Sequence, residues 1–183
     1  MPQSLETGML YIFGGLPGTG KSSLSSRLAR HCRAVYLRID TIEQAVKAAG
    51  TALIGPEGYQ AAFGLATDNL CLGNEVVADS VNSIETTRAA WREAAGLAQR
   101  PYVEIEVICS DVDEHRTRIE SRISDIAGLR LPTWQDVVNR DYEPWITEHI
   151  VIDTAGRSRD QSFAELIDGL RSKGLLRSRA PSL

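Results

Sequence analysis

The sequence predicts an α/β domain with a five-stranded parallel sheet and helices on both faces. Short apolar runs alternate with stretches of helical periodicity along the chain, which is the order that a parallel sheet requires. The 183 residues, 43% of them hydrophobic and 24% charged, suit one globular domain. We expect this domain at residues 9–172, between an N-terminal extension at 1–8 and a flexible basic tail at 173–183.

Five short segments have the composition of buried strands. The segment Tyr102–Cys109 alternates apolar residues with Glu104 and Glu106, so we expect one of its faces to be more solvated and the strand to lie nearer the sheet edge. The predicted strands are Met9–Phe13, Ala34–Ile39, Glu75–Ala78, Tyr102–Cys109 and His149–Asp153.

Helical periodicity fills the intervals between these strands. Ser110, with Asp113 three residues later, resembles a capping box, which places a helix start at Ser110. A segment at about 122–133 contains Gly128 and Pro132 without a sustained period, and we expect a mobile lid there. The predicted helices are Lys21–His31, Asp40–Ala49, Pro56–Leu72, Ile84–Gln99, Ser110–Arg122, Trp134–Trp145 and a closing helix around Phe163–Leu170.

Charge and hydropathy exclude several classes of protein. A net charge of −4 provides no global attraction to nucleic acid or to an anionic membrane, so a polyanion site must be local. No apolar run reaches the roughly 18 residues that a membrane span needs. The N-terminus lacks a basic segment followed by a cleavage site, and we therefore expect a cytoplasmic protein.

A glycine-rich loop between the first predicted strand and helix fits the pattern G-x-x-x-x-G-K-[ST]. In this context, backbone N–H groups and a helix N-terminus point toward phosphate oxygens. Lys21 is expected to reach the β and γ phosphates, and the Ser22 hydroxyl to bind Mg²⁺. The residues expected to hold ATP are Gly15, Leu16, Pro17, Gly18, Thr19, Gly20, Lys21, Ser22 and Ser23.

Two aspartates follow predicted strands at the edge where open α/β sheets bind ligands. Asp40 there can accept the proton of an attacking hydroxyl, or it can cap the following helix with Glu43 completing a capping box. Asp79 can hold Mg²⁺ together with Ser22, or contact a substrate, or act only as a turn residue. The strand that ends near Asp79 lacks an Asp-Glu pair, which favours a transferase over a water-activating ATPase.

Arginines on two predicted helices are candidates for anion binding. Arg88 lies at the end of its helix that faces the presumed cleft and could bind an anionic substrate. Arg118 and Arg122 are four residues apart, just before the lid, so both could reach transferring phosphate oxygens when the lid closes. Salt bridges within the helix are the alternative for these two arginines.

Taken together, these motifs resemble the small P-loop kinases of the zeta-toxin, chloramphenicol phosphotransferase and polynucleotide kinase type, which have an AAA-like ATP-binding domain. The resemblance spans about residues 9–170. It rests on GGLPGTGKSS at Gly14–Ser23, RID at Arg38–Asp40, VVADSVN at Val76–Asn82, TRAAW up to Trp91 and EHRTRIESR at Glu114–Arg122.

The resemblance implies a P-loop NTPase fold and a role for each candidate residue. Asp40 matches the base that faces the substrate hydroxyl, and Asp79 matches an aspartate beside substrate and metal. Arg118 and Arg122 match lid arginines that neutralise charge in the transition state, and Arg88 matches a substrate-side position. The loop at Thr154–Gly156 matches an adenine-contacting loop.

The sequence thus predicts a kinase that uses ATP and Mg²⁺ to phosphorylate a hydroxyl of a small molecule, such as a sugar, an antibiotic or a nucleotide sugar. A 5′-hydroxyl polynucleotide kinase is the second reading. It is disfavoured because ThrIleGluGln after Asp40 lacks the basic residue that some polynucleotide kinases have three positions later. A non-catalytic ATP-sensing module is the third, and the combination of Asp40 with the arginines weighs against it.

Overall fold

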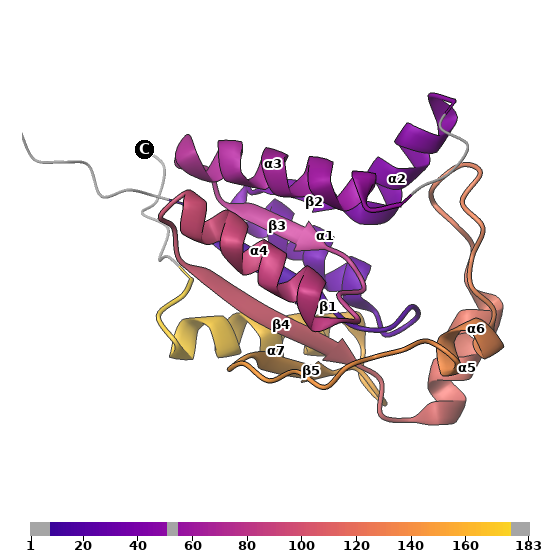
Figure 1. Ribbon diagram of the computed structural model, residues 1–183. Helices are drawn as coiled ribbons and strands as arrows, with labels where there is room; N and C mark the ends of the chain where they lie inside the picture. The colour runs from indigo at the N-terminus through magenta and orange to yellow at the C-terminus, as the bar shows by residue number, and fades with distance from the viewer. Residues whose placement is uncertain (1–7, 51–54, 177–183) are drawn as a thin grey trace, which may run out of the picture.

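A computed structural model describes residues 8–50 and 55–176. At its centre is a parallel sheet of five strands in the order β2-β3-β1-β4-β5 (Figure 1). The predicted fold class is therefore confirmed, and each expected strand is present within a few residues. The strands are β1 (Leu10–Gly14), β2 (Val35–Arg38), β3 (Val76–Asp79), β4 (Tyr102–Ile108) and β5 (Ile150–Asp153).

Helices cover both faces of the sheet, as parallel crossover connections require. On one face lie α1 (Lys21–Cys32) and α7 (Arg159–Ser172), and on the other lie α3 (Glu57–Cys71) and α4 (Glu85–Leu97), with α2 (Ile39–Ala48) beside α3. Two further helices, α5 (Val112–Ser121) and α6 (Trp134–Val138), lie beyond the carboxyl ends of the strands (Figure 1).

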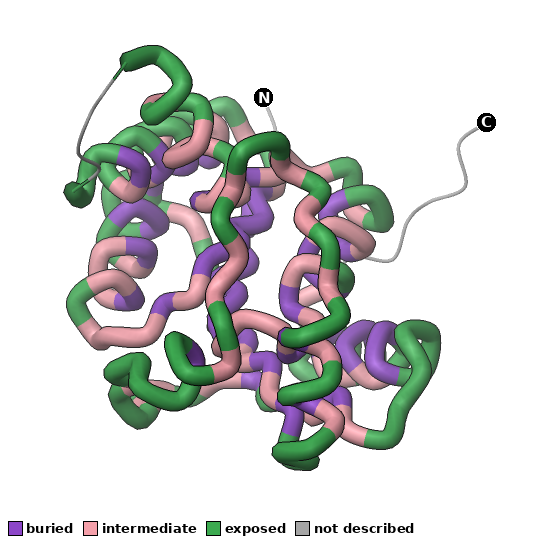
Figure 2. Tube along the Cα trace, turned by 90° about the vertical axis from the view of Figure 1, so that its right-hand side faces the viewer, coloured by how far each residue is buried: buried purple, intermediate pink, exposed green. Residues whose placement is uncertain are grey.

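The sheet separates two apolar cores, one under each helix layer. Leu28 and Leu166 are fully buried on the side of α1 and α7, and Leu70 and Trp91 on the side of α3 and α4. Figure 2 shows the buried strands running through the centre, with exposed helix surfaces and loops around them. These cores fix the strand ends, from which the site residues emerge.

The register aligns the carboxyl ends of the three strands that matter for the site. Phe13 of β1 and Arg38 of β2 both lie opposite Asp79 of β3. The loop after β1, the start of α2 and the end of β3 therefore meet at one edge of the sheet, which is the edge where open α/β folds bind ligands.

The expected helix Trp134–Trp145 ends at Val138, and the chain from 139 to 149 has no regular helix or strand. Tertiary contacts replace the hydrogen bonds of a helix in this segment. The Glu143 N–H donates to the Ser83 carbonyl at 2.8 Å, and the Tyr142 hydroxyl donates to Glu106 at 2.8 Å. The more solvated face predicted for the strand at 102–109 is present in part: Tyr102 is exposed and Glu106 half-buried, and β4 lies next to the edge strand β5. Glu104 on β4 is 1% exposed and pairs with Arg92 at 2.8 Å.

The helix start predicted at Ser110 is displaced by one residue. Asp111 is the N-cap of α5, and its carboxylate accepts from the Glu114 N–H at 2.9 Å. No helix among residues 8–50 and 55–176 is long and apolar enough to span a membrane. The expected N-terminal extension, apart from Gly8, and the expected tail beyond residue 176 lie outside the described residues.

Candidate active site

The loop between β1 and α1 has the backbone conformation that its glycines permit. Gly15 has a φ of 137°, and a Cβ atom there would lie 2.2 Å from the Val107 carbonyl oxygen, so only glycine fits. Gly20, with a φ of 94°, precedes the first residue of α1. The loop therefore turns tightly into a helix N-terminus, the arrangement that binds phosphate.

Lys21 and Asp79 form a buried ion pair behind this loop. The Lys21 Nζ donates to Asp79 Oδ1 at 2.6 Å, and the Tyr36 hydroxyl donates to Asp79 Oδ2 at 2.5 Å. Burial opposes the charge on Asp79, but the charge and hydrogen bond of Lys21 outweigh it, so the pKa of Asp79 lies below its usual value. Burial and Asp79 raise the pKa of Tyr36.

This cluster has oxygen ligands of the kind that Mg²⁺ prefers. Ser22 lines the cavity, and its hydroxyl is close enough to Asp79 to stabilise that carboxylate. The described residues contain no group of three His, Cys, Asp or Glu side chains that could hold a metal ion. Such a sparse set fits Mg²⁺, which usually keeps several waters and takes the remaining ligands from phosphates. The buried Asp79 does not line the cavity directly.

The other end of the phosphate loop is held by Thr154, which follows β5. The Thr154 hydroxyl donates to the Thr19 carbonyl at 2.8 Å, while Arg118 donates to the Thr154 hydroxyl at 2.7 Å and to its carbonyl at 2.9 Å. His115 of α5 donates from Nε2 to the Pro17 carbonyl at 2.7 Å. Arg118 therefore lines the cavity but binds the Thr154 loop and Glu114, so it is a support for the phosphate loop in this structure.

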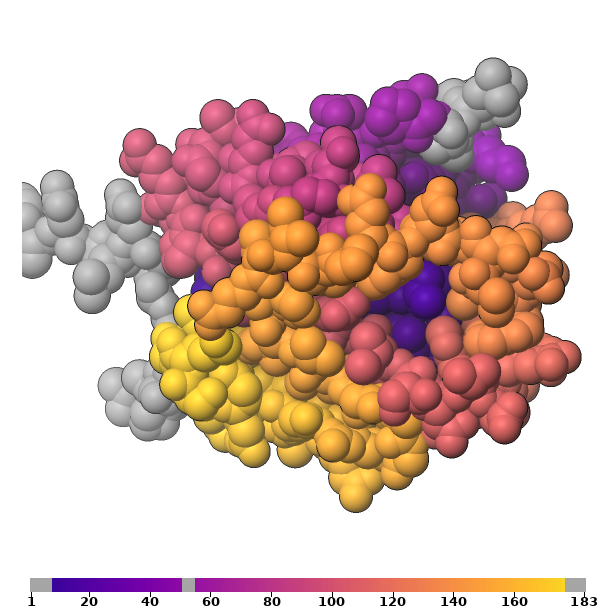
Figure 3. Space-filling view, turned by 60° about the horizontal axis from the view of Figure 1, so that its bottom comes forward, coloured from indigo at the N-terminus to yellow at the C-terminus, as the bar shows by residue number. Residues whose placement is uncertain are grey.

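A cavity of about 1690 Å³ opens above the phosphate loop. Its lining includes Lys21, Ser22, Asp40, Arg118 and Arg122, which brings most of the predicted site residues together. Nine basic and four acidic side chains of the described residues line it, a local excess of positive charge in an acidic protein. In Figure 3, indigo atoms from the first part of the chain lie at the bottom of a hollow framed by the orange segment.

Asp40 lines this cavity from the second residue of α2. Its interpretation as an N-cap is wrong, because the helix begins at Ile39 and the N-cap position falls on Arg38. The Asp40 carboxylate makes no hydrogen bond or ion pair with any residue that the structure describes. It is therefore available to a ligand.

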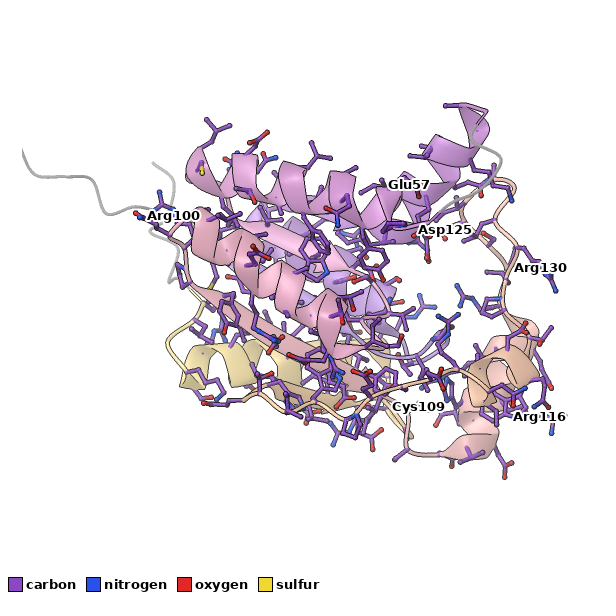
Figure 4. All side chains as sticks on the ribbon, in the orientation of Figure 1. Glu57, Arg100, Cys109, Arg116, Asp125 and Arg130 are labelled. Atoms are coloured by element: carbon purple, nitrogen blue, oxygen red, sulfur yellow. The ribbon has the colours of Figure 1, made fainter. Side chains whose placement is uncertain are left out.

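The loop at 122–133 has no helix or strand and passes over the cavity toward α2 (Figure 1). Asp125 of this loop is labelled in Figure 4. It forms a bidentate ion pair with Arg38, with N–O distances of 2.7 and 3.0 Å. Arg38 lowers the pKa of Asp125 and Asp125 raises that of Arg38. Arg122, at the base of the loop, lines the cavity without an ion pair to the described residues.

The structure does not place Arg88 in the cavity lining. This side chain is fully buried, donates to the Glu143 carbonyl at 3.0 Å and lies over the Trp145 ring at 4.7 Å. Its substrate-side position is a wrong prediction, because the segment at 139–149 covers the end of α4. That segment was expected to continue a helix, and so the covering contacts were not foreseen.

Four residues that were not among the predicted site residues also line the cavity: Tyr36, Arg38, Glu43 and Tyr59. Arg38 is the last residue of β2, and Tyr36 lies two residues before it, so both extend from the same face of the strand. The alternation of residues along the strand could therefore have indicated that Tyr36 and Arg38 face the cavity. For Glu43, the signal in the sequence was its spacing of three residues from Asp40, which was interpreted as a capping box.

The fold and the loop define a P-loop α/β nucleotide-binding protein. A family model described as AAA domain matches residues 10–127, and the chain belongs to this family. None of the curated proteins compared matches the chain. The domain has the fold of small P-loop kinases, as the following solved structures show.

A gluconokinase from Sinorhizobium meliloti 1021 is 16% identical, with a TM-score of 0.63 over 93% of this chain and 95% of that one. The APS kinase of Mycobacterium tuberculosis, solved with AMPPNP and APS, is 20% identical, with a TM-score of 0.67 over 90% and 98%. Kti12 of Chaetomium thermophilum, solved with ADP-AlF3, is 22% identical, with a TM-score of 0.62 over 87% and 97%.

Proposed function

We propose that the protein is a kinase that uses Mg²⁺ and ATP to transfer the γ-phosphoryl group to a hydroxyl of a small molecule, such as a sugar, an antibiotic or a nucleotide sugar. The observation that carries the proposal is that the phosphate loop lines the same cavity as the Asp40 carboxylate, which has no partner among residues 8–50 and 55–176. The gluconokinase and APS kinase similarities support a phosphotransferase.

Each group of residues that lines the cavity has its own task in the proposed reaction. Backbone amides of the loop and Lys21 hold the β and γ phosphates, while Ser22, with Asp79 behind it, fits a Mg²⁺ ion that would neutralise phosphate charge. Asp40 accepts the proton of the acceptor hydroxyl as its oxygen bonds to the γ phosphorus. The bond from that phosphorus to the bridging oxygen breaks, and ADP leaves with the electron pair.

Of the two predicted lid arginines, Arg122 remains available to stabilise the transferring group, because Arg118 is held by Thr154. Charge on a metaphosphate-like transition state is spread over three oxygens, and a guanidinium group can contact two of them. Closure of the loop at 122–133 over the cavity would also exclude water and so limit hydrolysis of ATP.

The experiment is a screen of hydroxyl-bearing metabolites, antibiotics and a 5′-hydroxyl oligonucleotide for acceptor-stimulated release of ADP. We expect stimulation by a small molecule and none by the oligonucleotide. Stimulation by the oligonucleotide alone, with strong salt dependence, would make the protein a polynucleotide kinase. Tight ATP binding without stimulation by any compound would make it an ATP-sensing module.

A further inference from the structure

We propose that the acceptor carries an ammonium group, which Glu43 binds while the acceptor hydroxyl faces Asp40. This inference rests on the proposed function and concerns the same cavity. It names the chemical class of acceptor: a hydroxyl compound with a positively charged amine, such as an amino sugar, an amino alcohol or an aminoglycoside.

The acceptor wall is the part of the cavity formed by Asp40 and Glu43 of α2, Tyr59 of α3, and Val81 and Ser83 after β3. A base for the hydroxyl requires only one carboxylate, and Asp40 supplies it. Glu43 lies three residues later on the same helix, so its carboxylate faces the same side. The second acidic group on this wall has no task in the transfer itself.

Glu43 occupies a place that α3 leaves open for it. A Cβ atom at Gly58 would lie 2.4 Å from the Glu43 Cγ, closer than real Cβ contacts come. Gly58 is buried in the first turn of α3, although glycine stabilises a helix less than alanine does. The glycine thus makes room for the Glu43 side chain, so that Glu43 keeps its place on the cavity wall.

The two carboxylates have no positive partner within the part of the chain that the structure describes. Neither makes an ion pair there, and Arg38, the cation on the adjoining strand, is committed to both oxygens of Asp125. Burial, and then the charge of Asp40, raise the pKa of Glu43. A cation bound at this wall would remove the repulsion, whereas an anionic acceptor would increase it.

Neutral polar groups complete the wall. Ser80 is 4% exposed, and its hydroxyl has no hydrogen-bond partner at normal distance among the described residues. It lies beside the Tyr59 hydroxyl and directly before Val81, both on the cavity wall. Burial raises the pKa of Tyr59 to about 12, so its hydroxyl stays a hydrogen-bond donor. A hydroxyl-rich acceptor could use both groups.

An ammonium group fits this wall better than a metal ion does. Ca²⁺ sites use six to eight oxygen ligands, and the described residues contain no group of three acidic, His or Cys side chains. Mg²⁺ takes its remaining ligands from phosphates, which the loop between β1 and α1 is built to bind, rather than this wall. Two carboxylates with hydroxyl neighbours suit the three donors of an ammonium group instead.

The test compares matched acceptors: amino sugars, amino alcohols and aminoglycosides, each beside its N-acetyl derivative, in the coupled assay for ADP release. Acetylation removes the charge and keeps the hydroxyls. We expect kcat/KM to be at least about tenfold higher for the amine, as loss of one charge-assisted contact implies. Equal or faster transfer to N-acetyl or carboxylate compounds overturns this inference and leaves the proposed function intact. No transfer to any compound overturns both.

Two variants locate the effect on Glu43. Glu43→Gln should raise KM for the amine by about tenfold and abolish the preference over the N-acetyl form. Gly58→Ala, which favours the helix but displaces Glu43, should change the preference in the same direction with the charge retained. Glu93→Gln, on an exposed part of α4, is the matched control and should change nothing.

If Glu43 only packs against α3, Glu43→Gln will keep that packing and leave the preference for amines unchanged, which overturns the proposal. A changed Mg²⁺ dependence in Glu43→Gln, with the preference for amines intact, would assign the wall to a metal ion and overturn it as well.

Discussion

The two walls of the cavity differ in how far their charges are already paired within the protein. The phosphate wall is the part of the cavity formed by the loop between β1 and α1 together with Lys21 and Thr154. On this wall, Lys21 is bound to Asp79, and Thr154 links the Thr19 carbonyl to Arg118. On the acceptor wall, Asp40 and Glu43 have no cation beside them among the described residues. The charges of the first wall are thus paired within the protein, whereas we expect a bound ligand to pair those of the second.

The two walls also differ in how the sequence encodes them. The phosphate wall recognises a group that all nucleoside triphosphates share, and one local motif encodes it. The acceptor wall is assembled from α2, the start of α3 and the loop after β3, which come together only in the fold. Selection of the acceptor is therefore expected to depend on residues that no short motif contains.

Among the contacts that the phosphate wall and the lid make within the protein, loss of Lys21 has the largest expected effect. Lys21→Ala should lower phosphoryl transfer by about 10²–10³-fold, because it removes a donor to the transferring group. It should also destabilise the fold by about 3–5 kcal/mol, because Asp79 would remain buried without its cation. Lys47→Ala, exposed near the end of α2, is the control for both the transfer assay and the melting curve. Unchanged transfer by a folded Lys21→Ala protein would contradict the assignment of this wall.

A smaller effect is expected where Thr154 supports the loop. Thr154→Val should cost about 1–3 kcal/mol and weaken ATP binding, because the buried Thr19 carbonyl and Arg118 each lose a partner. Thr117→Val on the exposed side of α5 should stay within about 0.5 kcal/mol. If the two variants unfold at the same urea concentration and bind ATP equally, the phosphate wall is not held in the way described.

The lid contact should matter less still. Asp125→Asn weakens an ion pair whose acidic partner is 72% exposed, so we expect a cost of about 0.2–1 kcal/mol, seen as up to about fivefold faster protease cleavage within 122–133. Asp141→Asn, also exposed, is the control. Equal cleavage of the two variants would show that the pair does not hold the loop over the cavity.

The same contact has the weakest expected dependence on pH. Arg38 lowers the pKa of Asp125 from its ordinary 3.8, so the pair contributes stability above that value and loses it as the pH falls through the lowered pKa. Cleavage of the loop should thus be constant from about pH 5 to 8 and increase only below about pH 4. An increase near pH 6 would require another titrating group.

The features that could be predicted from the sequence are those with local signals, and the features that could not are those that depend on contacts between distant residues. The five strands and the phosphate loop were predicted because apolar runs and glycine spacing are local signals. Asp40 was placed at the cavity edge, although its helix starts one residue earlier than expected. The position of Arg88 and the form of 139–149 were wrong, because Trp145 and Tyr142 contact residues that are distant in the sequence.

Long-range pairs explain the remaining differences. Arg38 and Asp125 are 87 positions apart, and Arg118 and Thr154 are 36 apart, so no periodicity could show that these arginines have partners. Arg118 was assigned as a phosphate ligand from its spacing to Arg122 and from the resemblance, and neither signal contains its contact with Thr154. Glu43 shows the converse, since its room at Gly58 becomes visible only when α2 and α3 are packed.

The fate of the γ-phosphoryl group tests the central claim most directly. With γ-labelled ATP and an acceptor from the screen, the wild-type protein and the exposed-site control Asp68→Asn should place the label on the acceptor. Asp40→Ala should bind ATP with unchanged affinity and transfer about 10²–10⁴-fold more slowly. Transfer by Asp40→Ala at the wild-type rate would contradict the claim that this carboxylate and the phosphate loop act on one phosphoryl group.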